Sequence, residues 1–197
     1  MTGGGNGEVS PAAKAVEQAL RALVRAAPGL TVLTGGQTGV DTYASLAALQ
    51  AGLTVHLIFP AGYRQEDGTL TPARRRRFAG ASLHELPSAS FRYRTWTCAY
   101  LADAVLLLDP AGGSGCRETV RAATRLGRPL LVSRSGATTA AQTADWLTSS
   151  GARALMVGGC RASVLASKGK GRGLRTELAA IMAGARHYHD ELIAAAK

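Results

Sequence analysis

The 197-residue sequence predicts an α/β fold in which a mainly parallel sheet is covered by helices on both faces. Short apolar runs alternate with longer segments whose apolar residues recur at helical spacing. The short runs are continuously apolar, as expected of strands buried on both faces of a parallel sheet. The chain length fits one domain. We therefore expect a flexible tail over residues 1–9 and a single domain over 10–197.

The first half of the chain predicts two helix and strand pairs followed by a loop. Residues 11–27 have helical spacing that stops at Pro28 and Gly29. The following segments are a strand over 30–36, a helix over 40–51, a strand over 54–60 and a polar loop over 61–80. Long ordered loops in compact domains are often functional, which draws attention to 61–80.

The second half continues the alternation. We expect a short strand over 83–86, a helix over 91–102, a strand over 104–110, a helix over 116–126, a strand over 129–132, a helix over 138–150, a strand over 154–159 and a closing helix over 174–196. Ligands of such folds lie beyond the carboxyl ends of the strands. The residues that follow each strand are therefore the first candidates for a binding site.

The formal charge of +10 and the pI near 10.3 favour anionic partners such as nucleotides, phosphorylated substrates or nucleic acid. A general abundance of arginine is the alternative explanation. The first ten residues lack the apolar segment of a secretory signal, and no apolar run is long enough to span a membrane. We expect a cytoplasmic protein without membrane partners.

Three cysteines, Cys98, Cys116 and Cys160, lie far apart and form no CxxC pair. This spacing argues against a disulfide framework and against a structural zinc site. His187 and His189 are two residues apart on a predicted helix, so they face different directions and do not form a metal-ligand pair. No metal site is therefore predicted.

A glycine turn follows the first strand and leads into a helix that carries Asp41 near its start. Glycine backbone approaches an anion closely, and the first N–H groups of a helix are unpaired. Thr38 could both cap this helix and donate its hydroxyl. A tight capped turn without a ligand is the alternative. The predicted phosphate-binding residues are Gly35, Gly36, Gln37, Thr38 and Gly39.

A second glycine turn follows the strand over 104–110, so two turns could hold the two ends of a nucleotide. Cys116 lies at a helix start, where a thiol pKa falls if the group is exposed, but no histidine is near it in sequence. Glu118 either complements the helix dipole or faces a ribose hydroxyl or anomeric carbon. The predicted ligand-binding residues of this turn are Gly112, Gly113, Ser114 and Gly115.

Two further strand ends carry charged residues. The loop after the second strand holds Arg64, Glu66 and Asp67, which form either a binding loop or a solvated one. The arginine run 74–77 is either a solvated basic face or a contact for phosphate or nucleic acid. After the fifth strand, Arg161 is placed to bind phosphate, and the segment 168–173 is either a loop that closes over an anion or a flexible surface loop.

The chain resembles the SLOG superfamily, and within it the circularly permuted YpsA-type branch that has been labelled as molybdenum carriers. The resemblance covers residues 30–164. It is carried by TGGQTGVD at 34–41, PAGYRQEDG at 60–68, the Arg-Thr and Ala-Asp pairs between Arg94 and Asp103, LLLDPAGGSG at 106–115 and VGGCRAS at 157–163.

This resemblance implies a Rossmann-like, three-layer α/β/α fold with a mainly parallel sheet of about five to seven strands. It also implies a pocket for a nucleotide or nucleotide derivative, and a homodimer, because the related LOG enzymes pair through helices. The implied lining is Gly35, Gly36, Thr38, Gly39, Asp41, Arg64, Glu66, Asp67, Gly112, Gly113, Ser114 and Arg161.

The sequence departs from the LOG enzymes, whose PGGxGTxxE motif ends in a glutamate that supports N-glycosidic cleavage. The equivalent position here is Thr119, and Glu118 lies one residue early, about 100° around a helix. Aligned from the downstream LGRP, the usual carboxylate falls at Arg121, and a second family carboxylate is replaced by Ala162. The remaining candidates for catalysis are Asp41, Glu66, Asp67 and Glu118.

Three functions follow as hypotheses. The first is binding of a nucleotide-like ligand, with N-glycosidic cleavage of nucleoside monophosphates or ADP-ribose-like molecules as its enzymatic version. The second is a non-catalytic carrier or sensor for a molybdenum-cofactor-type ligand. The third is single-stranded nucleic-acid binding, which the scarcity of aromatic residues disfavours. Binding is better supported than turnover, and the sequence establishes no cofactor.

Overall fold

The computed structural model describes residues 16, 27–108, 113–134, 140–167 and 171–196. Six strands form one sheet in the order β5-β2-β1-β8-β6-β7, and every neighbouring pair is parallel. The strands are β1 (Thr31–Thr34), β2 (Thr54–Phe59), β5 (Ser82–Glu85), β6 (Ala104–Leu108), β7 (Leu130–Ser133) and β8 (Ala154–Gly159). Each strand predicted from the sequence is present.

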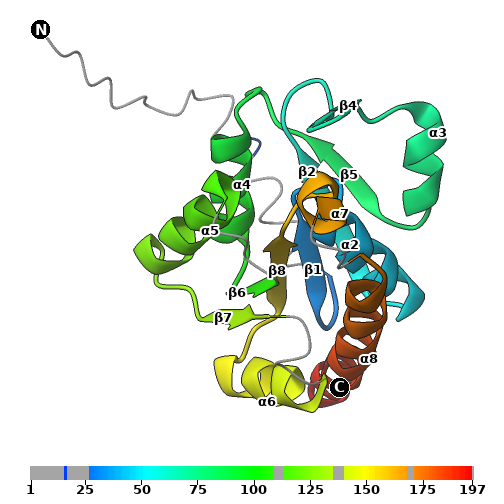
Figure 1. Cartoon of the computed structure of the whole chain (residues 1–197). Helices are drawn as coiled ribbons and strands as arrows, with labels where there is room; N and C mark the ends of the chain where they lie inside the picture. The colour runs from blue at the N-terminus through cyan, green and yellow to red at the C-terminus, as the bar shows by residue number, and fades with distance from the viewer. Residues whose placement is uncertain (1–15, 17–26, 109–112, 135–139, 168–170, 197) are drawn as a thin grey trace, which may run out of the picture.

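Helices cover both faces of the sheet and complete a three-layer α/β/α arrangement (Figure 1). On one face, α8 (Gly171–Ala195) packs against α2 (Val40–Gln50) and α6 (Ala140–Ser150). On the other face, α4 (Phe91–Leu101) packs against α5 (Ser114–Arg125). The predicted Rossmann-like α/β fold is thus confirmed.

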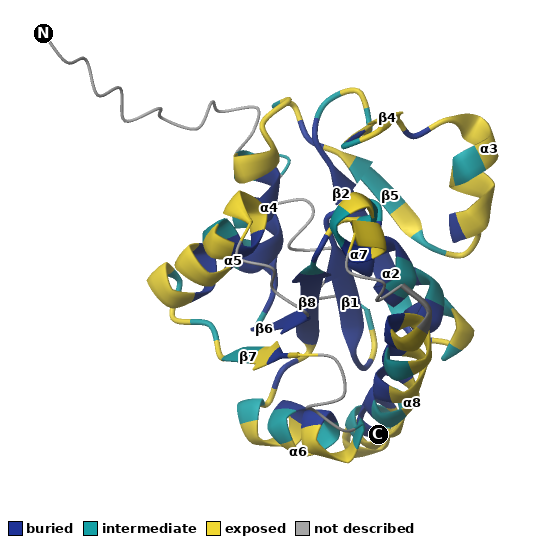
Figure 2. Cartoon of the chain, viewed as in Figure 1, coloured by how far each residue is buried: buried dark blue, intermediate teal, exposed yellow. Residues whose placement is uncertain are grey.

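The apolar runs of the sequence become strands buried on both faces, as Figure 2 shows for β1 and β8. Alternate residues of β6 point to opposite sides, with Leu106 in the cluster under α2 and α8 and Val105 in the cluster under α4 and α5. Each fully buried leucine or valine of this kind contributes about 1.5–3 kcal/mol of transfer free energy. The sheet is therefore a rigid support for the loops at its ends.

Two segments differ from the sequence-based expectation. The predicted loop over 61–80 contains a hairpin of β3 (Arg64–Gln65) and β4 (Gly68–Thr69), the short helix α3 (Pro72–Arg75) and a 3₁₀ turn, η1 (Arg76–Phe78). Thr71 caps α3 through its hydroxyl, which accepts a hydrogen bond from the backbone of Arg74 at 3.3 Å. The second segment is α7 (Ala162–Ser167), a stretch for which the sequence predicts no helix or strand.

The expected tail over 1–9 and the expected helix over 11–27 lie outside the described residues, except for Val16 and Ala27. Val16 is helical and packs against the cluster under α4. Among the described residues, no helix is both long enough and apolar enough to cross a membrane.

The connections place a crevice at the centre of the sheet. From β1 the chain moves outward to β2 and β5, and from β6 it moves outward in the other direction to β7. The carboxyl ends of β1, β8 and β6 lie between these diverging connections. Such a switch point is where open parallel sheets bind ligands.

Candidate functional site

A pocket of about 340 Å³ opens at the carboxyl ends of β1 and β8. Its walls come from the turn after β1, from the hairpin loop after β2, and from the starts of α4 and α5. The lining residues are Gln37, Asp41, Glu66, Phe91, Arg92, Arg94, Thr95, Ser114, Gly115, Glu118, Thr119, Met156, Gly158, Gly159 and Arg161.

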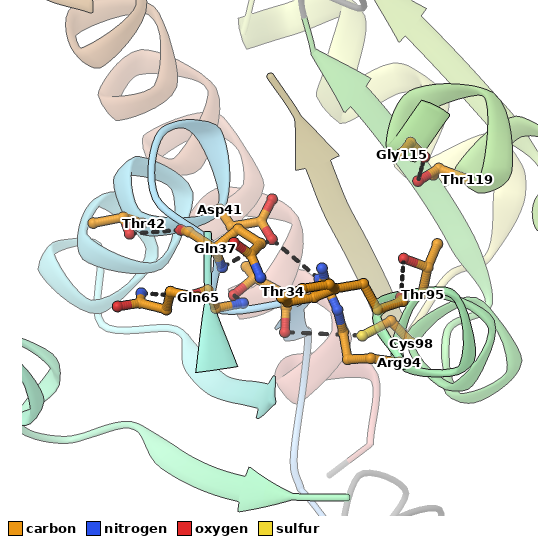
Figure 3. Close-up of polar contacts among 12 residues, drawn as sticks. Thr34, Gln37, Asp41, Thr42, Gln65, Arg94, Thr95, Cys98, Gly115 and Thr119 are labelled. Atoms are coloured by element: carbon orange, nitrogen blue, oxygen red, sulfur yellow. Dashed lines mark hydrogen bonds and ion pairs between the residues drawn. The ribbon is translucent and has the colours of Figure 1, made fainter. Parts of the chain in front are cut away.

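Asp41 and Arg94, which both line this pocket, form a buried ion pair (Figure 3). The guanidinium Nη1 of Arg94 lies 3.3 Å from Oδ2 of Asp41, and each side chain is only 8% exposed. The same Asp41 oxygen accepts a hydrogen bond from the backbone N–H of Gln37 at 3.3 Å. Burial raises the pKa of Asp41, whereas Arg94 and the backbone N–H donors of Gln37 and Gly35 oppose that rise.

The Arg94 side chain passes directly over the backbone of Gly35 to reach Asp41, and a side chain at position 35 would leave it no room. A Cβ at position 35 would lie 0.8 Å from Nη1 of Arg94. Nε of Arg94 is buried without a hydrogen-bond partner. Unpaired buried donors are costly, so the position of Arg94 carries a free-energy cost that its ion pair with Asp41 must offset.

The other glycines of the first turn pack against the protein itself. Gly36 has φ of +64°, and a Cβ there would lie 2.3 Å from the ring of Phe59. Gly39 has φ of +84°, and a Cβ there would lie 2.4 Å from the carbonyl oxygen of Cys160 and 2.5 Å from the nitrogen of Ala162. Gly36 thus lets the turn pack closely on β2, and Gly39 lets it pack on the loop that follows β8.

Thr38 does not cap α2, contrary to the sequence-based expectation. The N-cap is Gly39, and no side chain accepts a hydrogen bond there. The hydroxyl of Thr38 instead donates to Oε1 of Glu66. The physical reason is that the turn places this hydroxyl toward the hairpin loop, where Glu66 accepts it.

Two glutamines join the hairpin loop to the first glycine turn. Oε1 of Gln37 accepts from the backbone N–H of Glu66 at 2.9 Å, and Nε2 of Gln65 donates to the carbonyl oxygen of Gly36 at 2.6 Å. Both glutamines are buried. This double connection fixes Glu66 at the pocket edge.

Glu66 also receives donors from the loop after β8. Its Oε2 accepts from the hydroxyl of Ser163 at 3.1 Å and lies 3.7 Å from Nη1 of Arg161. The side chain of Arg161 is 53% exposed, so this guanidinium keeps access to solvent and to the pocket.

Glu118 connects α4 to α5 at the opposite wall. Its Oε1 accepts from the indole N–H of Trp96 and from Nε of Arg92, the latter at 2.9 Å, and its Oε2 accepts from Nη1 of Arg121 at 3.1 Å. The hydrogen bond from Trp96, followed by those of the two arginines, lowers the pKa of Glu118. Glu118 is therefore a carboxylate at neutral pH.

The structure brings part of the predicted set to the pocket and leaves part outside. The predicted residues that line it are Gln37, Asp41, Glu66, Ser114, Gly115, Glu118 and Arg161. Those that do not line it are Gly35, Gly36, Thr38, Gly39, Arg64, Asp67 and Gly113. Gly112 lies outside the described residues. Asp67 pairs with Arg74 at the surface, and Arg64 lies over the ring of Phe91, 5.5 Å from its centroid.

The sequence reading assigned no role to the α4 wall. Arg94, Cys98 and Leu101 lie three and four residues apart on one buried face of this helix. An arginine on an otherwise apolar buried face is unusual because its charge needs a partner. The presence of Arg94 among apolar residues at helical spacing was therefore the feature of the sequence that could have identified it as a site residue.

The described lining of the pocket contains no cysteine or histidine side chain. Cys98, Cys116 and Cys160 are all buried free thiols, and Cys116 does not line the pocket. His189 is buried and accepts from the backbone N–H of Leu30, whereas His187 is exposed and lies near Glu191. The described ranges contain no group of three or more histidine, cysteine, aspartate or glutamate side chains that could hold a metal ion.

Comparison with known proteins gives two findings. A family model described as the circularly permuted YpsA SLOG family matches residues 32–171. Among solved structures, a protein from Syntrophus aciditrophicus described as a putative molybdenum carrier protein is similar, with a TM-score of 0.64 and 20% identity. The alignment covers 79% of this chain and 96% of that one. At this identity the likeness shows the fold. No curated protein matches the chain.

Proposed function

Because the chain belongs to the circularly permuted YpsA SLOG family, we propose that it binds a nucleotide or nucleotide-derived small molecule in the pocket beyond β1 and β8. The observation that supports this proposal is that one pocket is lined by a helix start with a nearby arginine, by carboxylates and by apolar side chains. These groups suit the phosphate, the sugar and the base of a nucleotide, respectively.

The phosphate would lie at the start of α5. Ser114 and Gly115 line the pocket in the first turn of this helix of twelve residues, where unpaired backbone N–H groups and the helix dipole favour an anion. A Cβ at Gly115 would meet no atom of the described residues within 4 Å. Arg161 supplies a guanidinium that could bind phosphate oxygens in a bidentate manner.

The sugar would face carboxylates. Among the described residues, three arginines and three carboxylates line the pocket, and they form the pairs Arg94–Asp41, Arg161–Glu66 and Arg92–Glu118. The charges of the lining thus balance, so its interior suits hydroxyl groups that donate to carboxylates better than a second full negative charge. The ring of Phe91 and the thioether of Met156 supply apolar surface for a base.

The same pairs favour binding over N-glycosidic cleavage. A general acid must hold a proton near neutral pH. Glu118 is kept ionised by its three donors, and Glu66 accepts from Thr38 and Ser163. Asp41 accepts from Arg94 and the turn backbone. Each pocket carboxylate therefore already accepts hydrogen bonds from the protein, and burial raises the pKa of Asp41 among them.

A molybdenum-containing ligand is the second candidate, because the structurally similar Syntrophus aciditrophicus protein is described as a putative molybdenum carrier protein. Where the structure is described, histidine, cysteine and carboxylate side chains form no metal-holding cluster. The lining fits such cargo only as an oxyanion or through a phosphate group, because arginine and helix N–H donors recognise oxygen anions. Molybdate and a nucleoside monophosphate therefore compete for the same donors in this proposal.

Thermal unfolding with added ligand tests both candidates. Nucleoside monophosphates, ADP-ribose, NAD and molybdate are added in turn, and bound ligand stabilises by about 2.7 kcal/mol at a hundredfold excess over Kd. For a chain of this length that raises Tm by roughly 5–11 °C. The proposal is wrong if no nucleotide shifts Tm at millimolar concentration. A shift with molybdate alone would favour the second candidate.

A matched pair of variants locates the binding. Arg161→Gln removes a charge-assisted hydrogen bond worth about 1.5–3 kcal/mol, so Kd should rise about 10- to 150-fold. Arg125→Gln removes an equal charge from the exposed last turn of α5, outside the pocket lining, and should leave Kd nearly unchanged. Equal losses in the two variants would contradict binding in this pocket. Chromatography of the same incubations detects any free base, and base release abolished by Glu118→Gln would establish the enzymatic alternative.

A further inference from the structure

A second pocket, of about 190 Å³, lies beside the first, on the far side of the contact between Thr38 and Glu66. It is bounded by α2, by the segment from β3 to η1, by the start of α7 and by α8. The lining residues are Thr38, Gly39, Thr42, Tyr43, Gln65, Leu70, Arg74, Arg77, Phe78, Ala162 and Arg175. We call it the arginine pocket, because its described lining includes three arginines and no carboxylate.

Two arginines of the run at 74–77, Arg74 and Arg77, form one side of this pocket. Arg74 pairs with Asp67, and Arg75 lies over the ring of Tyr63, 3.9 Å from its centroid. Arg76 does not line the arginine pocket, whereas Arg77 does. Arg77 has no carboxylate partner within the described part of the chain. Its position is therefore not explained by an ion pair.

Arg175 forms the other side, near the start of α8. Its guanidinium carbon lies 4.5 Å from the centroid of the Tyr43 ring, and Nη2 donates to the Tyr43 hydroxyl at 3.2 Å. The first turn of α8 contains no acidic residue. A bound anion would offset the charge of Arg175 and the positive end of the α8 dipole.

The polar lining offers a set of donors. The Tyr43 oxygen accepts from Arg175, so its own O–H is left to donate. Arg74 is held in place by Asp67 and donates to the side-chain oxygen of Gln65 at 3.3 Å. With the charge of Arg74 balanced by Asp67, Arg77 and Arg175 leave two positive charges, which match a phosphate dianion.

From this cavity and its charges we propose that the arginine pocket binds a phosphate-class oxyanion, carried by a small phosphorylated molecule or free in solution. Its volume is smaller than the roughly 300–1,000 Å³ of pockets for drug-sized ligands, and it suits a phosphate-sized group. Guanidinium groups bind phosphate through paired N–H donors, and the Tyr43 hydroxyl would donate a further hydrogen bond to the anion. The Glu66 carboxylate lies between the two pockets, so this anion is separate from the ligand of the main pocket.

Isothermal titration with inorganic phosphate and pyrophosphate at low salt tests the proposal on the full chain. The double variant Arg77→Gln/Arg175→Gln should bind at least about tenfold more weakly than the wild type, since two charge-assisted contacts are lost. The control Arg76→Gln changes the same arginine run outside the pocket and should bind within about twofold of the wild type, after correction for net charge. Both side chains of the double variant are exposed, so its Tm without phosphate should lie within about 4 °C of the wild type, the cost of losing the contact between Arg175 and Tyr43.

The outcomes separate this site from the main pocket. Phosphate binding that survives Arg161→Gln and is lost in the double variant supports the arginine pocket, whatever the result with nucleotides. Loss in Arg161→Gln with retention in the double variant places the phosphate in the main pocket and overturns the proposal. Absence of binding to the wild type at millimolar phosphate and pyrophosphate also overturns it, as does equal weakening by Arg76→Gln. A phosphorylated sugar that binds more tightly than free phosphate, with the same dependence on Arg77 and Arg175, would identify the source of the anion.

Discussion

Replacement of Asp41 by asparagine should destabilise the protein strongly, because it leaves the Arg94 guanidinium buried without its counter-charge. Both side chains are 8% exposed and their charged atoms are 3.3 Å apart. Removing one partner of such a buried pair costs about 3–5 kcal/mol, most of it from the uncompensated charge. For a chain of this size the loss lowers Tm by roughly 6–20 °C.

A double-mutant cycle in urea measures the part of this cost that belongs to the pair. Asp41→Asn, Arg94→Met and the combined variant are unfolded under identical conditions, and their free energies of unfolding are compared. Methionine keeps much of the length of arginine without its charge. We expect the loss of unfolding free energy in the double variant to be smaller than the sum of the two single losses by about 1–3 kcal/mol, because no unpaired charge remains.

Two results would refute this reasoning. A loss below about 1 kcal/mol in Asp41→Asn would mean that the charge of Arg94 is solvated, as in a surface pair. Additivity within about 0.5 kcal/mol would mean that the two side chains do not interact energetically.

Two further predictions concern stability. Burial, and next the neighbouring His84, lower the pKa of His56 to about 4. The unfolded chain takes up this proton at higher pH, so stability present above pH 6.5 is lost as pH falls toward 4, by roughly 3 kcal/mol; His56→Asn should flatten this dependence in urea titrations. Gly39→Ala should cost more than about 2 kcal/mol through its positive φ and its collision with residues 160–162. Gly127→Ala, at φ of +63° in open space, should cost only about 1–2 kcal/mol, and equal losses would contradict the collision.

The sheet could be predicted because strand burial on both faces produces a direct sequence signal. The run at 104–108 has no polar residue, and all five side chains are buried. The same holds for most of β2 and β8. The hairpin of β3 and β4 has two residues in each strand, too few for any periodic pattern to appear.

The site was harder to predict because its glycines have internal roles that a sequence does not distinguish from ligand contact. Gly35 makes room for Arg94, which lies 59 residues later in the chain, and Gly39 makes room for the backbone at 160–162. Only the fold brings these segments together. The charged pairs across the pocket likewise join residues from different elements, so spacing along the chain could not assign Arg94 to Asp41 or Arg92 to Glu118.

The central position of β8 has a consequence for how the protein is made. This strand pairs with β1 on one side and β6 on the other, yet residues 154–159 leave the ribosome after all the other strands. Until then, β5-β2-β1 and β6-β7 are two separate parallel ribbons, each with an unpaired inner edge that can join another chain. Nascent chains should therefore need chaperones most between the synthesis of β7 and β8, and ribosome profiling of chaperone contacts can locate that window.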